Sequence, residues 1–218
     1  MNGTKATAIY QFCKENDIAL ILFDYLGHGD SSGNFIDYTI SDWCNNCIKV
    51  INELTTNSKQ IIIGSSMGGW LMLLTALQLP EKILALIGIS SAPDFTEDLI
   101  FQQLSNKQME ILISHGIIDF ASSKEEYHNC TYQITNNLIL DGKKNLLLNK
   151  ENIDIECPIR LLHGMNDRDV PYYTSLKIAE KVKSNDVKVH LIKSAEHNMS
   201  DDYSLNVLFY TIKEFCVN

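Results

Sequence analysis

The sequence lacks long apolar runs, a cationic leader and clusters of basic residues. No apolar run approaches the ~20 residues that a membrane-spanning helix requires. The first residues, Met1 to Ala6, lack the positive start and apolar stretch of a signal peptide. Lys and Arg number 18 against 27 Asp and Glu, a net charge of −9, and no basic stripe offsets that balance. We therefore expect a soluble, intracellular, cytoplasmic protein that does not bind nucleic acid.

Internal repeats and low-complexity linkers are also missing. At 218 residues and 45% hydrophobic, the chain can bury one substantial core. This length suits one domain with an insertion better than two independent domains.

Cysteines are few and scattered, apart from the C-x-x-C pair Cys44 and Cys47 inside the helical pattern of residues 41–54. The pair could be a redox couple or half of a metal site. A thioredoxin-like pair belongs at a junction of strand and helix, and a zinc site needs further ligands at matching spacing. We therefore interpret the cysteines as small buried thiols and expect neither a metal nor a cofactor.

Short apolar runs alternate with helical patterns through most of the chain. We expect helices over about 4–15, 41–54, 67–79, 171–182 and 205–216, and strands over 18–23, 61–63, 83–89, 159–162 and 187–191. This alternation predicts an α/β fold, a mostly parallel sheet covered by helices on both faces.

The alternation stops between residues 92 and 152, where only helical patches, at 99–104 and 109–113, are recognisable. We interpret 92–152 as an inserted helical cap between the core segments 1–91 and 153–218. Its apolar residues either contact an acyl group or only pack against the core. They are Phe95, Leu99, Phe101, Leu104, Ile117, Ile118 and Phe120.

The motif that points to chemistry is Gly64-Ser65-Ser66-Met67-Gly68, a Gly-x-Ser-x-Gly between an apolar run and a helical pattern. Strand, sharp turn and helix are the context of a nucleophile elbow, which holds its serine in a strained turn. We expect Gly64 and Gly68 to remove side chains that would collide, and the Met67 N–H to face an oxyanion. The alternative is a glycine-rich turn without chemistry.

An elbow serine needs a base and an acid, which open α/β sheets carry on loops at the carboxyl ends of strands. Asp167 follows the predicted strand 159–162, and His197 follows the last strand. We therefore predict Ser66 as nucleophile, His197 as base and Asp167 as acid, with Asp169 as the competitor for the acid.

The other histidines fit the role of base less well. His190 lies inside a predicted strand, and we expect His163 to brace the turn that follows it. His28, His115 and His128 lack a partner acid at an equivalent place.

Further motifs accompany the elbow. Those common to many α/β-hydrolases are Gly64-Ser65-Ser66-Met67-Gly68-Gly69, Phe23-Asp24-Tyr25-x-Gly27-His28-Gly29-x-Ser31 and His163-Gly164-x-x-Asp167-x-x-Val170-Pro171. More specific stretches are Met1-Asn2-Gly3-Thr4-Lys5-Ala6, Gly69-Trp70-Leu71-Met72-Leu73, Pro80-Glu81-Lys82, Ala85-Leu86-Ile87-Gly88 and Cys157-Pro158-Ile159-Arg160-Leu161-Leu162-His163-Gly164-Met165. With them the chain resembles the α/β-hydrolase superfamily, and within it the mitochondrial palmitoyl-protein thioesterases and acyl-glucuronide esterases and their bacterial relatives. The chain order of serine, aspartate and histidine is also that of an α/β-hydrolase.

This resemblance implies an α/β-hydrolase fold, a triad of Ser66, Asp167 and His197, and a mitochondrial location if the source is eukaryotic. Family members carry a strand and a Gly-containing loop before the segment that matches Met1, and that loop supplies a second oxyanion N–H. We therefore expect the N-terminal strands to be missing and the chain to be a fragment or a late-start translation.

The function we expect is that of a serine hydrolase acting on acyl esters or thioesters, including acylated proteins, through an acyl-enzyme. Thioester substrates rest on the resemblance alone. One alternative is a serine aminopeptidase-like enzyme, for which Asp94, Glu97 and Asp98 could hold a substrate amine. Another is a truncated homologue without catalytic activity.

Overall fold

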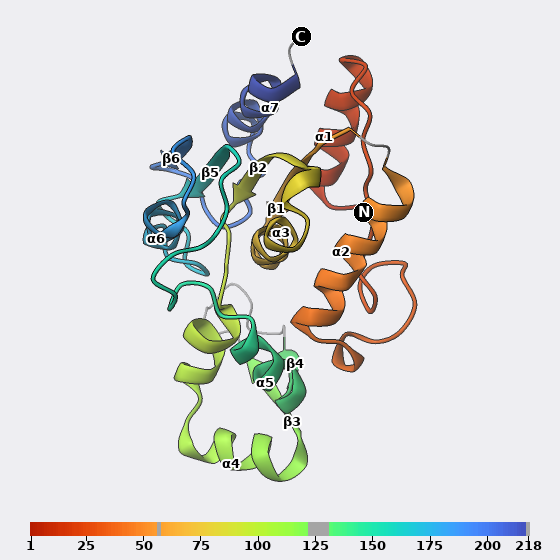
Figure 1. Ribbon diagram of the computed structural model, residues 1–218. Helices are drawn as coiled ribbons and strands as arrows, with labels where there is room; N and C mark the ends of the chain where they lie inside the picture. Colours follow the sequence, from red (N-terminus) through yellow and green to blue (C-terminus); the bar gives the residue numbers. More distant parts are fainter. Residues whose placement is uncertain (56–57, 122–130, 217–218) are drawn as a thin grey trace.

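Four parallel strands form the sheet at the centre of the computed structural model, which describes residues 1–55, 58–121 and 131–216 (Figure 1). Their order is β1-β2-β5-β6. The strands are β1 (Gln60–Ser65), β2 (Ile83–Ile89), β5 (Ile159–Gly164) and β6 (Val187–Ile192). Each neighbouring pair is parallel. The predicted parallel sheet is confirmed.

Alternate residues of the central strands face opposite layers of apolar side chains. Leu86 and Leu161 belong to one buried cluster, whereas Ile87 and Leu162 belong to the other. A strand covered on both faces has no reason to alternate polar with apolar residues, so β2 is a continuous apolar run.

Helices cover both faces, as expected. On one face lie α1 (Thr4–Glu15) and α7 (Asp202–Cys216). They meet where Phe12 and Phe209 stack with ring centroids 4.5 Å apart. The other face is covered by α2 (Ile40–Leu54), α3 (Met67–Gln78) and α6 (Tyr173–Lys181).

The strand predicted over residues 18–23 was wrong. The segment pairs with no strand of the described sheet, and Ile21 is 41% exposed. The Ile18 N–H donates instead to the Cys13 carbonyl at the end of α1. A run of apolar residues becomes a strand only beside a hydrogen-bonded neighbour. β1 lies at the edge of the described sheet, but it does not pair with residues 18–23.

Between β2 and β5 the chain makes α4 (Asn106–His115), β3 (Ile117–Ala121), β4 (Thr131–Thr135) and α5 (Asn136–Lys144), preceded by a π-helical turn (Thr96–Ile100) and a 3-10 turn (Phe101–Gln103). The segment contains helices, as expected, but also two strands that we did not predict: β3 and β4 pair antiparallel, with Ile118 opposite Ile134. Five-residue strands of mixed polarity give little period-two signal in the sequence.

Most of the apolar residues predicted for the insertion are used in packing. Leu104 and Ile118 are buried in the larger core cluster, and Phe95, Phe101 and Phe120 pack against it. Burial against the core, the second of the two interpretations, therefore accounts for these five side chains.

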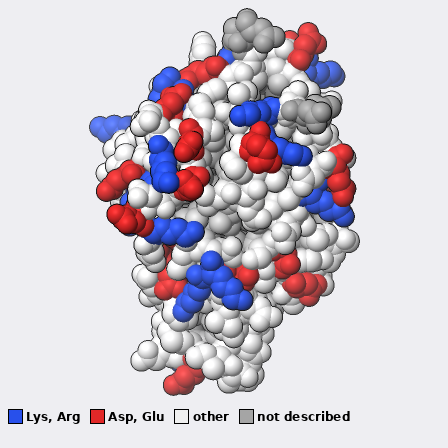
Figure 2. Space-filling view, viewed as in Figure 1, with Lys and Arg blue, Asp and Glu red and all other residues white. Residues whose placement is uncertain are grey.

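Acidic and basic side chains intermingle over the core on the face seen in Figure 2, and the lower end of that view carries few charges. Among the residues described, no helix combines the length and the apolar character that crossing a membrane requires.

Candidate active site

Ser66 joins β1 to α3 and has a backbone conformation that few residues adopt. Its φ is 54° and its ψ is −122°. A non-glycine residue at such angles is strained and persists only where the surroundings fix it. Here the Ser66 N–H donates to Ile89 O over 2.9 Å, and the Ser66 carbonyl accepts from Gly69 and Ala92. These bonds tie the turn to the end of β2.

The glycines of the motif have unequal roles. A Cβ at Gly64 would lie 2.3 Å from the Gly68 carbonyl oxygen, so only glycine lets strand and helix approach this closely. A Cβ at Gly68 would meet nothing nearer than the Tyr25 hydroxyl at 3.4 Å, an ordinary contact. The expectation that Gly68 avoids a collision was therefore wrong, and the crowding is at Gly64.

The loops after β5 and β6 lie against each other. The Met165 N–H donates to Ile192 O, and the Asn166 N–H donates to Ala195 O over 3.0 Å. A Cβ at Gly164 would lie 2.3 Å from that Ala195 oxygen. This contact brings together two loops that are far apart in sequence.

The structure places the three predicted side chains in one hydrogen-bonded row. Ser66 Oγ lies 3.0 Å from His197 Nε2, and His197 Nδ1 lies 2.8 Å from Asp167 Oδ2. The Asp167 side chain is fully buried, whereas that of His197 is 20% exposed. A carboxylate hidden from solvent thus contacts a histidine that is partly exposed to solvent.

The carboxyl group of Asp167 is held in its ionised form. Burial acts to raise its pKa, but hydrogen bonds from His163, His197 and the Val170 N–H outweigh burial and keep the pKa well below its ordinary value. A carboxylate only accepts hydrogen bonds, so the His197 proton sits on Nδ1. The lone pair of Nε2 then faces the Ser66 hydroxyl.

Asp169, the competing acid, supports Asp167. The N–H groups of Asp169 and Val170 each donate to Asp167 Oδ1 over 2.8 Å. One ligand atom from each of Asp167, Asp169 and His197 falls within a 4.8 Å cluster, close enough to hold a metal ion. Both Asp167 oxygens and His197 Nδ1 are already hydrogen-bonded, so the cluster is accounted for without an ion.

The Met67 N–H follows Ser66 directly in the chain. Met67 is the first residue of α3. The first N–H groups of a helix have no acceptor within that helix and attract negative charge. The role of the Met67 N–H as oxyanion donor stays a prediction.

The remaining described histidines lie elsewhere. His28 packs among aromatic rings, 5.1 Å from the Trp43 centroid. His115 contacts the Ser114 hydroxyl at the end of α4, and His190 lies within β6. His128 falls outside the described residues.

His163 is closer to the site than the sequence suggested. We expected it to brace the turn, yet its Nε2 also lies 3.1 Å from Asp167 Oδ2. Its other nitrogen contacts Ser175 Oγ, a residue that the sequence did not single out. Twelve residues and a loop separate the two, so no spacing rule could find this contact.

The described cysteines are free thiols. Burial first, and then the neighbouring Cys44, raises the pKa of Cys47 to about 12. A thiol with so high a pKa is a poor nucleophile and a poor metal ligand. Cys13 and Cys44 are buried as expected, whereas Cys47, Cys157 and Cys216 are only partly buried.

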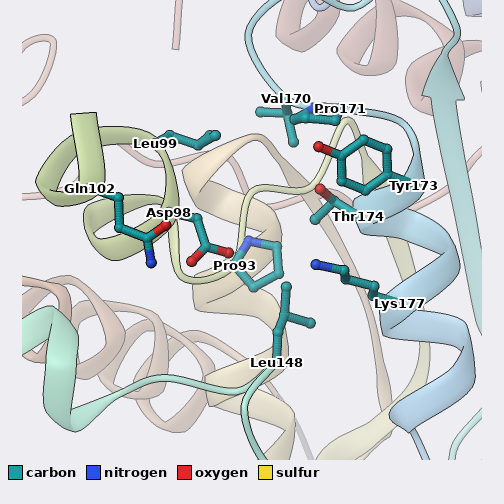
Figure 3. A pocket seen from close by; sticks show the side chains of 10 residues that line it. All are labelled: Pro93, Asp98, Leu99, Gln102, Leu148, Val170, Pro171, Tyr173, Thr174 and Lys177. Carbon is teal, nitrogen blue, oxygen red and sulfur yellow. The ribbon is translucent and has the colours of Figure 1, made fainter.

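A cavity of about 280 Å³ lies between α6 and the segment that follows β2. Figure 3 shows the side chains that line it. Asp98, Gln102, Thr174 and Lys177 make its lining polar, and the Lys177 ammonium points into it. Leu99, one of the apolar residues that we expected either to contact an acyl group or to pack against the core, also lines it. The cavity borders the Asp167 loop at Val170 and Pro171, but Ser66 and His197 are not part of its lining.

The chain is similar to known hydrolases over nearly its whole length. The family model described as serine aminopeptidase, S33, matches residues 4–203. The human mitochondrial palmitoyl-protein thioesterase ABHD10 is 40% identical over 214 residues, which are 98% of this chain and 68% of that protein.

Solved structures agree with the sequence comparison. The mouse α/β-hydrolase domain-containing protein 10 is 35% identical with a TM-score of 0.88, covering 98% of this chain and 84% of that one. A hydrolase described as putative from Agrobacterium vitis is 32% identical with a TM-score of 0.91, covering 99% and 83%. The chain therefore belongs to the α/β-hydrolase superfamily, in the family described as serine aminopeptidase, S33.

Proposed function

We propose that the protein is a serine hydrolase that cleaves acyl esters or thioesters through an acyl-enzyme, with Ser66 as nucleophile, His197 as base and Asp167 as acid. The observation that carries the proposal is the row of contacts from Ser66 Oγ to His197 Nε2, 3.0 Å, and from His197 Nδ1 to Asp167 Oδ2, 2.8 Å. Nucleophile, base and orienting acid within hydrogen-bond reach are what acyl transfer requires.

In the first half-reaction, Ser66 Oγ attacks the acyl carbonyl carbon while its proton passes to His197 Nε2. The carbonyl oxygen becomes an oxyanion, to which the Met67 N–H donates. Asp167 stabilises the imidazolium through Nδ1–H. When the tetrahedral intermediate collapses, the bond to the alcohol or thiol breaks, and His197 returns its proton to that leaving group.

In the second half-reaction, water takes the place of the leaving group. His197 accepts a proton from water, the resulting oxygen nucleophile attacks the acyl carbon, and Ser66 leaves with the proton that His197 returns. The products are a carboxylic acid and the free enzyme. Neither half-reaction draws on groups beyond the three side chains, a backbone donor and water.

The substrate class comes from the relatives. The human relative at 40% identity is named a palmitoyl-protein thioesterase, and we extend thioesters, including acylated proteins, to this chain on that basis. The residues themselves support acyl transfer in general. We assign 92–152 as the cap over the core segments 1–91 and 153–218. A cytoplasmic location stays a prediction, and the curated relatives are mitochondrial by name.

An aminopeptidase activity, suggested by the family description, finds less support. An aminopeptidase needs a free carboxylate to hold the substrate amine, yet Asp94 is buried and accepts from the Leu147 and Leu148 N–H groups. Glu97 lies 3.9 Å from the Lys143 ammonium. Of these three acidic residues, only Asp98 lines the cavity, and the Lys177 ammonium points into the same cavity.

Labelling with a fluorophosphonate probe tests the proposal. We expect Ser66 to be labelled, Ser66→Ala to lose the label, and Ser65→Ala to keep it as the matched control. Rates on p-nitrophenyl acyl esters, acyl thioesters and aminoacyl anilides then separate the substrate classes. Labelling that is absent, or that survives Ser66→Ala, would contradict the proposal and favour a homologue without catalytic activity.

A further inference from the structure

The proposed acid, Asp167, is hydrogen-bonded to two histidines. His163, the second-to-last residue of β5, is completely buried. Its Nε2 lies 3.1 Å from Asp167 Oδ2 and 3.0 Å from the Val170 carbonyl oxygen. Asp167 Oδ2 is also the oxygen that contacts His197. One carboxylate oxygen therefore lies between two imidazole rings.

The contacts of His163 determine its tautomer. Both neighbours of Nε2 are acceptors, so this nitrogen must carry a proton. Nδ1 lies 2.7 Å from Ser175 Oγ on α6, and that hydroxyl can donate to a nitrogen lone pair. The neutral Nε2–H form thus satisfies both nitrogens and places no extra charge in the interior.

The same contacts restrain the carboxylate. Oδ1 accepts from two backbone N–H groups of its own loop, and Oδ2 accepts from His197. His163 is the donor that comes from the strand. It opposes rotation of the carboxylate away from His197, and by sharing Oδ2 it lowers the basicity of the oxygen that His197 contacts.

We propose that His163, fixed by the Ser175 hydroxyl as its Nε2–H tautomer, is a positioning residue. It orients the Asp167 carboxylate and reduces how strongly that carboxylate stabilises protonated His197. The proposal rests on the proposed function. It assigns no contact with substrate to His163, so the expected effect is on kcat and on the pH profile, with KM unchanged.

The ionisable groups around His163 are few in the described part of the chain. Asp167 contacts it directly, and His197 and Asp169 lie beyond that carboxylate. From α6 the neutral Ser175 faces it, and its register partner on β6 is Leu191. A change in the pH profile of a His163 variant can therefore be assigned to the Asp167 and His197 pair.

The test compares His163→Leu, which removes the donor at similar volume, with His163→Gln, whose amide N–H reaches toward the same oxygen. His190→Leu and His190→Gln are the matched controls, because His190 lies on β6 outside this row. Hydrolysis of a p-nitrophenyl ester is measured as kcat and KM across pH, with thermal unfolding as the check on folding.

We expect His163→Leu to lower kcat by up to about 100-fold at unchanged KM, the effect of a displaced catalytic group. The acid limb of its kcat/KM profile should move to higher pH, because Asp167 then holds a protonated His197 more strongly. His163→Gln should restore most of kcat and the original limb. Ser175→Ala should fall between the two, and both His190 variants should match the parent.

Several outcomes would overturn the proposal. A folded His163→Leu with the parent kcat and pH profile would do so. If His163→Leu does not fold, His163→Gln and Ser175→Ala decide, and losses that track only their melting temperatures would make His163 a structural brace. Failure of the parent itself to hydrolyse esters or label at Ser66 is a different result, which would overturn the proposed function along with this role.

Discussion

The carboxyl edge of the sheet and the insertion between β2 and β5 differ in how firmly their side chains are fixed. At the edge, Ser66 is strained and the buried Asp167 oxygens accept four hydrogen bonds. The insertion exposes large apolar residues, with Ile113 at 71%. The side chains that are held most precisely thus lie on the strands and the loops that follow them. We expect residues of the segment between β2 and β5 to tolerate substitution better.

The two regions meet at Asp94. This residue follows β2 at a positive φ of 62°, and its carboxylate accepts from the Leu147 and Leu148 N–H groups at the far end of the insertion. A single buried carboxylate therefore links the start and the end of the inserted segment.

The largest effect should come from Asp167, the proposed acid. Asp167→Asn should lower kcat by about 10⁴-fold, because an amide can donate to His197 and favour the wrong tautomer. Asp169→Asn should cost far less, since Asp169 supports Asp167 through its backbone N–H. Steady-state hydrolysis of an acyl ester measures both. Equal losses in the two variants would mean that the acid is shared.

The elbow should tolerate alanine at one glycine and not at the other. Gly64→Ala places a Cβ 2.3 Å from the Gly68 carbonyl oxygen, so we expect a loss of about 3 kcal/mol in the free energy of unfolding and little activity. Gly68→Ala, whose Cβ has room, should unfold near the parent in urea. The reverse order would show that the elbow is packed differently.

Much of this edge could be predicted from the sequence, because local signals agree there. Apolar runs identify β2 and β5, and Gly64, Ser66 and the helical pattern after them identify the elbow. Loops after parallel strands meet at one edge, which places Asp167 and His197 near Ser66 without any long-range information.

Other features of the fold and the site could not be predicted, because they depend on contacts with residues that lie outside the local sequence pattern. Residues 18–23 are as apolar as a strand, but pairing decides strand structure, and they pair with none of the described strands. β3 and β4 are too short to give a clear alternation of apolar and polar residues. The contact between Ser175 and His163 crosses from helix to strand, and the space at Gly68 depends on where Tyr25 lies.

The junction at Asp94 should contribute to stability. Burial raises the pKa of Asp94, although the Leu147 and Leu148 N–H groups oppose that rise. Asp94→Ala leaves both N–H groups unpaired and puts alanine at a positive φ, so we expect a loss of about 2–3 kcal/mol in urea unfolding. Asp94→Asn tolerates this φ and keeps one acceptor, so it should lose less. Similar losses in both variants would implicate the charge.

The acid side of the stability curve should depend on Asp167. Its folded pKa lies below the ordinary 3.8, because hydrogen bonds outweigh burial. The stability it contributes is therefore present above 3.8 and is lost as pH falls toward the lowered value. The parent's advantage over Asp167→Asn in urea should be smaller at about pH 3 than at about pH 6. An advantage independent of pH would contradict the lowered pKa.

The smallest effect should be on the exposed surface of the insertion. Ile113 is 71% exposed on α4, whereas its neighbour Leu112 is 1% exposed. Ile113→Ser should change the free energy of unfolding by no more than about 0.5 kcal/mol and leave ester hydrolysis unchanged. Leu112→Ala, as the buried control, should cost about 2–5 kcal/mol. A loss of activity on long-chain but not short-chain esters in Ile113→Ser would mean that this surface meets substrate, and the insertion would then be less tolerant than its exposure indicates.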